Sequence, residues 1–244
     1  MRVYAIGDIH GQLSMLQDAL DRIAEDRAAH GGDAMVVHLG DLCDRGPDTA
    51  GVLQFLIDGI ADGQPWRAVL GNHDLMMRNF LEADGPDDPR FEKAEWWLQS
   101  ALGGAQTLGS YGVHDTFDPL TAQAAFREAV PDAHRAFLQG LEPYIPTEDL
   151  ILVHAGIRPG VPMAQQAEED LTWIREPFLS DTTDHGRLVV HGHTPVEEPL
   201  HAGNRVDLDT GAGFFRPLTA AVFEGRRCFI LEEDGRRELL PPVA

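Results

Sequence analysis

The chain has 244 residues, 43% of them hydrophobic and 24% charged, a composition that excludes disordered, collagen-like and membrane-spanning proteins. Forty acidic residues against nineteen basic ones give a formal charge of −21, which disfavours binding to nucleic-acid backbones and to anionic membranes. With only two cysteines, Cys43 and Cys228, and with no apolar leader or membrane-length apolar run, we expect a reduced, cytoplasmic protein.

The first eighty residues alternate between apolar strand patterns and helical patterns. Strands are predicted at Val3–Ile6, Met35–Leu39 and Arg67–Leu70. Between them, apolar residues at helical spacing predict one helix that begins at Leu13 and another that begins at Pro47. This order of strands and helices predicts an α/β fold with parallel strands joined by helical crossovers.

Residues 82–149 differ because helical patterns replace the strands. An acidic, proline-containing loop at 82–90 precedes predicted helices at Phe91–Leu102 and Thr121–Gly140, with a glycine-rich turn region between them. No strand pattern is found inside this stretch. We therefore interpret it as a helical insertion or cap within a single domain that spans residues 1–244.

Strand patterns return after the helical stretch, at residues 150–153, 188–190, 205–208, 218–223 and 228–231. Short turns join the last three of these strands. That spacing predicts an antiparallel meander at the end of the chain.

Polar residues follow five of the predicted strands at the point where each strand ends. They stand in the segments 7–11 (GDIHG), 40–47 (GDLCDRGP), 71–74 (GNHD), 154–156 (HAG) and 191–195 (HGHTP). Ligands bind outside the carboxyl ends of the strands in open α/β sheets, so we expect these side chains to share one site.

The side chains at this edge offer two carboxylates, one amide oxygen and three imidazoles, but no thiolate. Such a set suits Mn²⁺, Fe or Zn²⁺ better than Mg²⁺, which prefers oxygen ligands and retains water. Six ligands are too many for one ion with an open position, but they fit two ions that share a carboxylate. Two ions ~3.5–4 Å apart can hold the attacking and leaving oxygens of a displacement at phosphorus.

In this order, the five motifs resemble those of the phosphoprotein phosphatase family of metallophosphoesterases, with the bacterial and bacteriophage lambda type of serine/threonine phosphatase nearest. The resemblance extends to Trp96–Gly104, to Thr172–Arg175 and to the DTGA segment within Val206–Ala212. It implies a four-layer α-β-β-α sandwich, in which two sheets pack between helical layers. It also implies two divalent metal ions, with manganese preferred over iron or zinc.

The resemblance also implies a role for each site residue. Asp8, His10 and Asp41 hold the first metal, and Asp41 bridges to a second metal held by Asn72, His154 and His193. His73 is the general acid, with Asp44 orienting it. Arg45 and Arg175, together with Asn72, bind the phosphoryl oxygens, a task that suits the forked guanidinium group.

The resulting prediction is a phosphomonoesterase for phosphoserine and phosphothreonine, which acts by direct attack of a hydroxide that bridges the two metals. The acidic side chains between 82 and 95 favour a peptide over a more highly charged dinucleotide. A symmetrical dinucleoside tetraphosphatase shares all five motifs and is the alternative. A non-catalytic pseudophosphatase that only binds its partner is the alternative from another class. No regulatory subunit is expected, because the SAPNY-containing segment of the eukaryotic members is missing.

Several further residues are interpreted as structural. His38 lies inside a predicted strand, where we expect a packed and hydrogen-bonded ring. Cys43 is expected to fill a small space in the core. Trp96 and Trp97 are expected in the core as well, with a substrate groove as the alternative.

Overall fold

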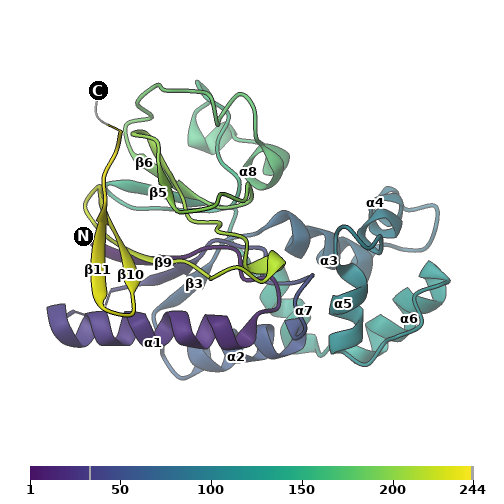
Figure 1. Ribbon diagram of the computed structural model, residues 1–244. Helices are drawn as coiled ribbons and strands as arrows, with labels where there is room; N and C mark the ends of the chain where they lie inside the picture. The colour runs from purple at the N-terminus through teal and green to yellow at the C-terminus, as the bar shows by residue number, and fades with distance from the viewer. Residues whose placement is uncertain (33, 243–244) are drawn as a thin grey trace.

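The computed structural model describes residues 1–32 and 34–242, with only the backbone described for residues 92–95 (Figure 1). Two β-sheets pack face to face, and helices flank them (Figure 1). This arrangement confirms the predicted fold class.

The first sheet has six strands in the order β11-β10-β9-β1-β2-β3. Its bounds are β1 (Arg2–Ile6), β2 (Val36–His38), β3 (Trp66–Ala68), β9 (Ala220–Glu224), β10 (Arg227–Glu232) and β11 (Gly235–Leu239). Strands β1, β2 and β3 are parallel, as their helical connections predicted, and β9 pairs antiparallel with β1. Helices α1 (Leu13–His30) and α2 (Thr49–Ala61) connect the parallel strands.

The second sheet has five strands in the order β4-β5-β6-β8-β7. Its bounds are β4 (Tyr144–Pro146), β5 (Leu150–Val153), β6 (Leu188–His191), β7 (Leu200–His201) and β8 (Arg205–Asp207). The predicted meander is wrong in one strand, because β8 pairs parallel with β6 in this sheet. The actual meander is β9, β10 and β11. Apolar alternation marks a buried strand but does not say which sheet it joins.

Three apolar cores account for the layers. The strands of both sheets contribute side chains such as Val37, Leu152, Val190 and Phe223 to the core between the sheets. A second core lies between the six-stranded sheet and its helices, and a third lies under α8 (Glu168–Trp173) on the outer face of the other sheet. No described helix combines the length and the apolar character needed to cross a bilayer.

The region 82–149 is helical over most of its length, but the prediction needs three corrections. It contains α4 (Pro89–Trp97), α5 (Gly104–Ser110), α6 (Pro119–Ala129) and α7 (Asp132–Gln139), and α3 (Asn72–Glu82) leads into it. The single helix predicted at 121–140 is broken at Pro131, which precedes α7 and cannot donate a backbone hydrogen bond. The predicted glycine-rich turn contains α5, and the stretch also contains the short strand β4.

Candidate metal centre

All six predicted ligands are buried at the edge where the two sheets meet. Asp8 follows β1, Asp41 follows β2, Asn72 opens α3, His154 follows β5 and His193 follows β6. His10 lies in the same loop as Asp8. None of the six side chains belongs to a residue more than 6% exposed.

Sharp backbone turns bring these side chains to the site. His10, Asp41 and His193 have positive φ angles of 49°, 48° and 68°, and Asp44 and Arg45 have angles of 74° and 62°. Positive φ is unfavourable for residues other than glycine, and such residues cluster at functional sites. The side chains are packed so closely that only glycine fits at position 192, since a Cβ atom there would lie 2.0 Å from Oδ1 of Asp8.

One group of converging atoms comes from Asp41, His154 and His193, whose ligand atoms lie within 4.8 Å of one another. Oδ1 of Asn72 lies 2.9 Å from Nε2 of His154 and 2.8 Å from Nδ1 of His193. Nδ1 of His154 donates to the carbonyl of Leu39, which leaves the lone pair on Nε2. The Nε2 lone pair of His154 and the amide oxygen of Asn72 are two acceptors 2.9 Å apart, an arrangement that fits a shared cation.

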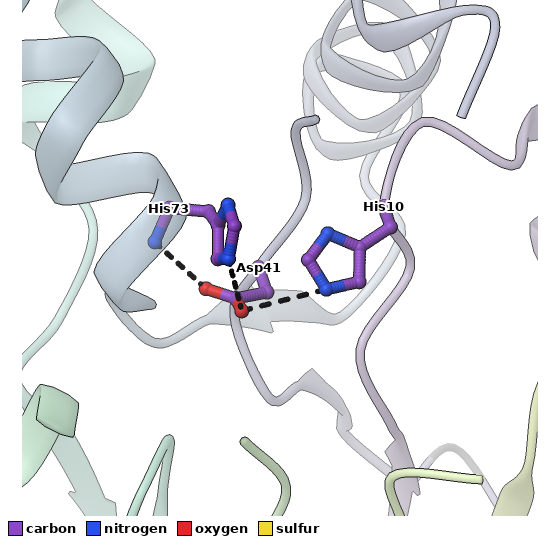
Figure 2. A group of neighbouring side chains, drawn as sticks. All are labelled: His10, Asp41 and His73. Carbon is purple, nitrogen blue, oxygen red and sulfur yellow. Dashed lines mark hydrogen bonds and ion pairs between the residues drawn. The ribbon is translucent and has the colours of Figure 1, made fainter. Parts of the chain in front are cut away.

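A second group is formed by His10, Asp41 and His73 (Figure 2). Nε2 of His10 lies 3.6 Å from Oδ2 of Asp41, while its Nδ1 donates to the carbonyl of Cys43. Burial lowers the pKa of His10 to about 3, so the ring is neutral and its Nε2 lone pair faces the carboxylate. The structure therefore brings Asp41 into both groups, as expected of a bridging ligand.

Asp8 lies beside these groups and was not found within either of them. Its Oδ2 accepts the backbone N–H of His193, and its buried Oδ1 has no hydrogen-bond partner among the described residues. Burial, together with the charges of Asp209 and Asp41, raises the pKa of Asp8 well above its ordinary value. A nearby cation would satisfy this oxygen and restore the ionised carboxylate.

The guanidinium group of Arg45 already places positive charge at the second group. Its Nη1 donates to Nε2 of His10 over 2.8 Å, and its Nη2 lies 3.1 Å from Nε2 of His73. The ring of Phe214 covers the guanidinium at 4.8 Å. The Nε2 lone pair of His10 thus already accepts from a cationic partner, which fits a metal ligand.

Asp44 holds His73 through a short hydrogen bond. Nδ1 of His73 donates to Oδ2 of Asp44 over 2.6 Å, and the backbone N–H of His73 donates to Asp41 over 3.0 Å. Burial lowers the pKa of His73, but the charges of Asp41 and Asp44 outweigh it and raise the pKa above its ordinary value. The ring can therefore carry the proton that a leaving group needs.

Sequence reasoning missed two partners of Asp44. Trp97 of α4 donates its indole N–H to Oδ2 over 2.6 Å, and Thr107 of α5 donates its hydroxyl to Oδ1 over 2.7 Å. Trp97 lies in the segment that resembles the phosphatases, which was an available signal, whereas Thr107 carried none. The core position expected for Trp97 is confirmed, and its polar edge contacts the site, but the core position expected for Trp96 is wrong because that residue is 43% exposed.

Asp74 is a second omission, although it ends the GNHD motif. Its carboxylate accepts the backbone N–H groups of Leu42 and Gly71 over 2.9 and 3.1 Å, which ties together the loops that follow β2 and β3. Burial and the charge of Asp41 raise the pKa of Asp74 to about 7. Its role in the site is to fix the loop that carries Asp41.

Arg175 is near enough to His154 and His193 for its charge to act on them, but its side chain is exposed. Among the residues that the structure describes, this side chain makes no hydrogen bond or ion pair. Burial is the main cause of the lowered pKa values of His154 and His193, and the charge of Arg175 adds to it. Its predicted role in phosphate binding stays a prediction.

One expectation about a surrounding residue changes. His38 is buried as expected, but neither ring nitrogen has a hydrogen-bond partner in the described part of the chain, so the predicted hydrogen bonding is wrong. Its ring packs edge-on against Trp66 inside the apolar layer, and burial lowers its pKa to about 3.

In the acidic loop, Arg90 pairs with Asp88 and Glu82 over 2.7 and 3.3 Å. The side chains of residues 92–95 in the same stretch lie outside the described residues.

The donor set fits two divalent ions. Neutral imidazoles, an ionised bridging carboxylate and a buried carboxylate oxygen without a partner are the groups that such ions require. Burial raises the pKa of Asp41, but the neighbouring histidines outweigh it and keep the pKa below its ordinary value. Oxygen and imidazole ligands together are compatible with manganese, iron or zinc.

Comparisons with known proteins agree with this geometry. The profile of the family described as calcineurin-like phosphoesterase matches residues 1–217. The bis(5'-nucleosyl)-tetraphosphatase PrpE (asymmetrical) of Anoxybacillus flavithermus is 29% identical over 235 residues, which cover 88% of this chain and 87% of that protein. The serine/threonine-protein phosphatase 1 of Salmonella typhimurium is 31% identical over 229 residues, covering 90% of each. A cold-active protein-tyrosine phosphatase from Shewanella shares the fold, with 16% identity, a TM-score of 0.63, and coverage of 98% of this chain and 80% of that chain.

Proposed function

The chain belongs to the calcineurin-like phosphoesterase family and is a hydrolase of phosphate bonds, and we propose that its substrates are bis(5'-nucleosyl) tetraphosphates. The observation that carries the chemistry is the convergence of the two buried groups on Asp41. The substrate assignment is supported by the similarity to the Anoxybacillus tetraphosphatase over most of both chains.

In this proposal, Asp8, His10 and Asp41 would hold one ion, and Asp41, Asn72, His154 and His193 would hold the other. Bound divalent ions supply an activated water and neutralise the charge that develops on the phosphoryl group. Manganese is the metal we propose, with iron and zinc as alternatives.

The chain's own residues bind the phosphoryl group and move the proton. The Arg45 guanidinium, beside His10 and His73, binds phosphoryl oxygens, and the exposed Arg175 and the amide of Asn72 assist it. His73 protonates the leaving oxygen while Asp44 holds its ring in place.

A phosphoserine or phosphothreonine protein is the second candidate substrate. The Salmonella serine/threonine-protein phosphatase 1 supports it, because that relative is 31% identical to this chain, against 29% for the Anoxybacillus protein. Both candidate substrates would place a phosphate at the metal site, and they differ in the group beside that phosphate, which is a nucleoside in one and a polypeptide in the other.

The test is a side-by-side measurement of kcat/KM with Mn²⁺ for diadenosine tetraphosphate, phosphoserine peptides and p-nitrophenyl phosphate. We expect the dinucleotide to be preferred over the peptides by at least tenfold, about 1.4 kcal/mol in transition-state binding. A tenfold preference for a peptide would replace the proposed substrate with the second candidate. A metal-loaded protein without turnover on any of the three would support the pseudophosphatase alternative.

Product analysis separates the two modes of dinucleotide cleavage. Symmetrical hydrolysis, which the sequence motifs suggested as the alternative, gives two nucleoside diphosphates. Asymmetrical hydrolysis gives a nucleoside monophosphate and a nucleoside triphosphate, and the name of the Anoxybacillus relative supports this mode.

A further inference from the structure

A cavity of about 390 Å³ opens where α4 meets α8. Two tryptophans form one wall: Trp96 in α4 and Trp173 at the end of α8, with ring centroids 5.9 Å apart and planes inclined by 31°. The other lining residues are Leu75, Met76, Asn79 and Glu169. This volume and mainly apolar lining are typical of sites for small organic groups.

The cavity borders the metal centre through Trp173. The ring of Trp173 lies 5.9 Å from the ring of His193 and meets it edge-on. Helix α3 also joins the two, because its first turn carries Asn72 and His73 and its later turns line the cavity. A group bound in the cavity would therefore lie next to a phosphate bound at the metals.

We propose that this cavity binds one nucleobase of the substrate and that Trp96 is the residue on which the base stacks. The inference rests on the proposed function: the phosphates of the dinucleotide would bind at the metal centre, and one of its bases would bind in the cavity. Trp96 is 43% exposed and offers a flat aromatic face. Because the two indoles contact each other, the base stacks on the exposed face of Trp96 and not between the rings.

The polar side chains of the cavity favour a base over an apolar peptide side chain. Asn79 offers both a donor and an acceptor, as required for the edge of adenine. Glu169 offers only acceptors, which suit an exocyclic amino group and repel phosphates. The phosphates are thus directed away from Glu169 and towards Arg45 and the metal ligands.

The expected effect of removing the stacking surface is measurable. Stacking on an aromatic side chain contributes about 1–3 kcal/mol per base, so Trp96→Ala should weaken binding by about 5- to 150-fold. The first measurement is calorimetric titration of the metal-loaded protein with adenosine, which has a base but no phosphate. The second is KM for diadenosine tetraphosphate relative to KM for p-nitrophenyl phosphate. Phe117→Ala is the control, since this aromatic residue is 97% exposed and does not line the cavity.

The two proposals fail in different ways. Unchanged adenosine affinity in Trp96→Ala, or no adenosine binding to the wild-type protein, would overturn the base site even if dinucleotides are hydrolysed. Adenosine binding that depends on Trp96, without dinucleotide hydrolysis, would leave the base site standing and reject the proposed substrate. A rise in KM for a phosphopeptide, but not for the dinucleotide, would assign the cavity to a peptide side chain instead.

Discussion

Trp97 donates its indole N–H to the same carboxylate oxygen of Asp44 that accepts the N–H of His73, each over 2.6 Å. The other oxygen of Asp44 accepts the hydroxyl of Thr107. The orientation of the proposed general acid therefore depends on the helical region between residues 82 and 149, and not only on the loops that follow the strands.

Trp97→Phe should lower both stability and turnover. The variant removes a hydrogen bond to a buried carboxylate, which should cost about 2 kcal/mol in the free energy of unfolding. It should also slow phosphoserine peptides more than p-nitrophenyl phosphate, because the peptide alkoxide needs the proton from His73. Chemical denaturation and kcat for both substrates measure these effects. Trp66→Phe makes the same change on β3 away from the site, and an equal kinetic loss there would argue against the role of Trp97.

His73→Asn should retain both metals and turn over slowly. General-acid catalysis contributes roughly 10²–10⁴-fold, so a loss of this size is expected with a phosphoserine peptide and a smaller one with p-nitrophenyl phosphate. Metal content measured on the same sample separates loss of the proton donor from loss of the metal. Equal losses on the two substrates would reject His73 as the general acid.

Asp41→Asn should weaken both metal sites, whereas His10→Ala should empty one. The prediction follows because Asp41 belongs to both groups of ligand atoms and His10 to only one. Metal stoichiometry after dialysis against Mn²⁺ provides the measurement. Chelation should abolish activity and Mn²⁺ should restore it, because neutral imidazoles and ionised carboxylates are required for binding. Full activity in a protein shown to be free of metal would contradict this mechanism.

Arg236→Met should destabilise the fold in a pH-dependent way. Arg236 of β11 donates to Asp26 of α1 over 2.8 Å, and the hydroxyl of Tyr4 donates to the same carboxylate over 2.7 Å. Burial raises the pKa of Asp26, but these hydrogen bonds outweigh it and hold the pKa below its ordinary value. The stabilisation is therefore present above the unfolded pKa of about 3.9 and is lost as the pH falls below it.

At pH 7 the loss should be about 3 kcal/mol in the free energy of unfolding, and it should shrink as the pH approaches 3. Urea denaturation at a series of pH values measures the difference between variant and wild type. Arg227→Met is the matched control on the neighbouring strand, because Arg227 and Glu238 form an exposed pair worth no more than about 1 kcal/mol. A difference that stays constant with pH would contradict the assignment to the carboxylates that Arg236 contacts, Asp26 and Glu224.

The ligand positions could be predicted from sequence because each of them follows directly from a strand or a strand-like pattern. Asp41 and His154 are examples: their strands β2 and β5 are apolar enough to recognise, although they belong to different sheets that meet at the site. The contacts of Asp44 with Trp97 and Thr107 could not be predicted, because they join residues 53 and 63 positions apart across helices whose packing no local pattern encodes.

Two errors in the fold have local physical causes. Pro131 interrupts a continuous helical pattern, so the apolar spacing alone merged α6 and α7 into one helix. Strand β8 was assigned to the meander because it is short and close in sequence to β9, yet Val206 pairs with Val190 in the other sheet. Proximity along the chain was a poor guide here, since the segment between β8 and β9 crosses from one sheet to the other.

Trp96 and Trp97 are adjacent in the chain but contact different parts of the site. Successive residues of a helix point about 100° apart, so one indole reaches the cavity wall beside Trp173 while the next reaches Asp44. The helical region consequently cannot be exchanged as an independent module between relatives. A chimera that imported residues 82–149 with another residue at position 96 would have a changed cavity wall, and one with another residue at position 97 would hold His73 less firmly. A one-residue insertion between Trp96 and Trp97 would disturb both contacts.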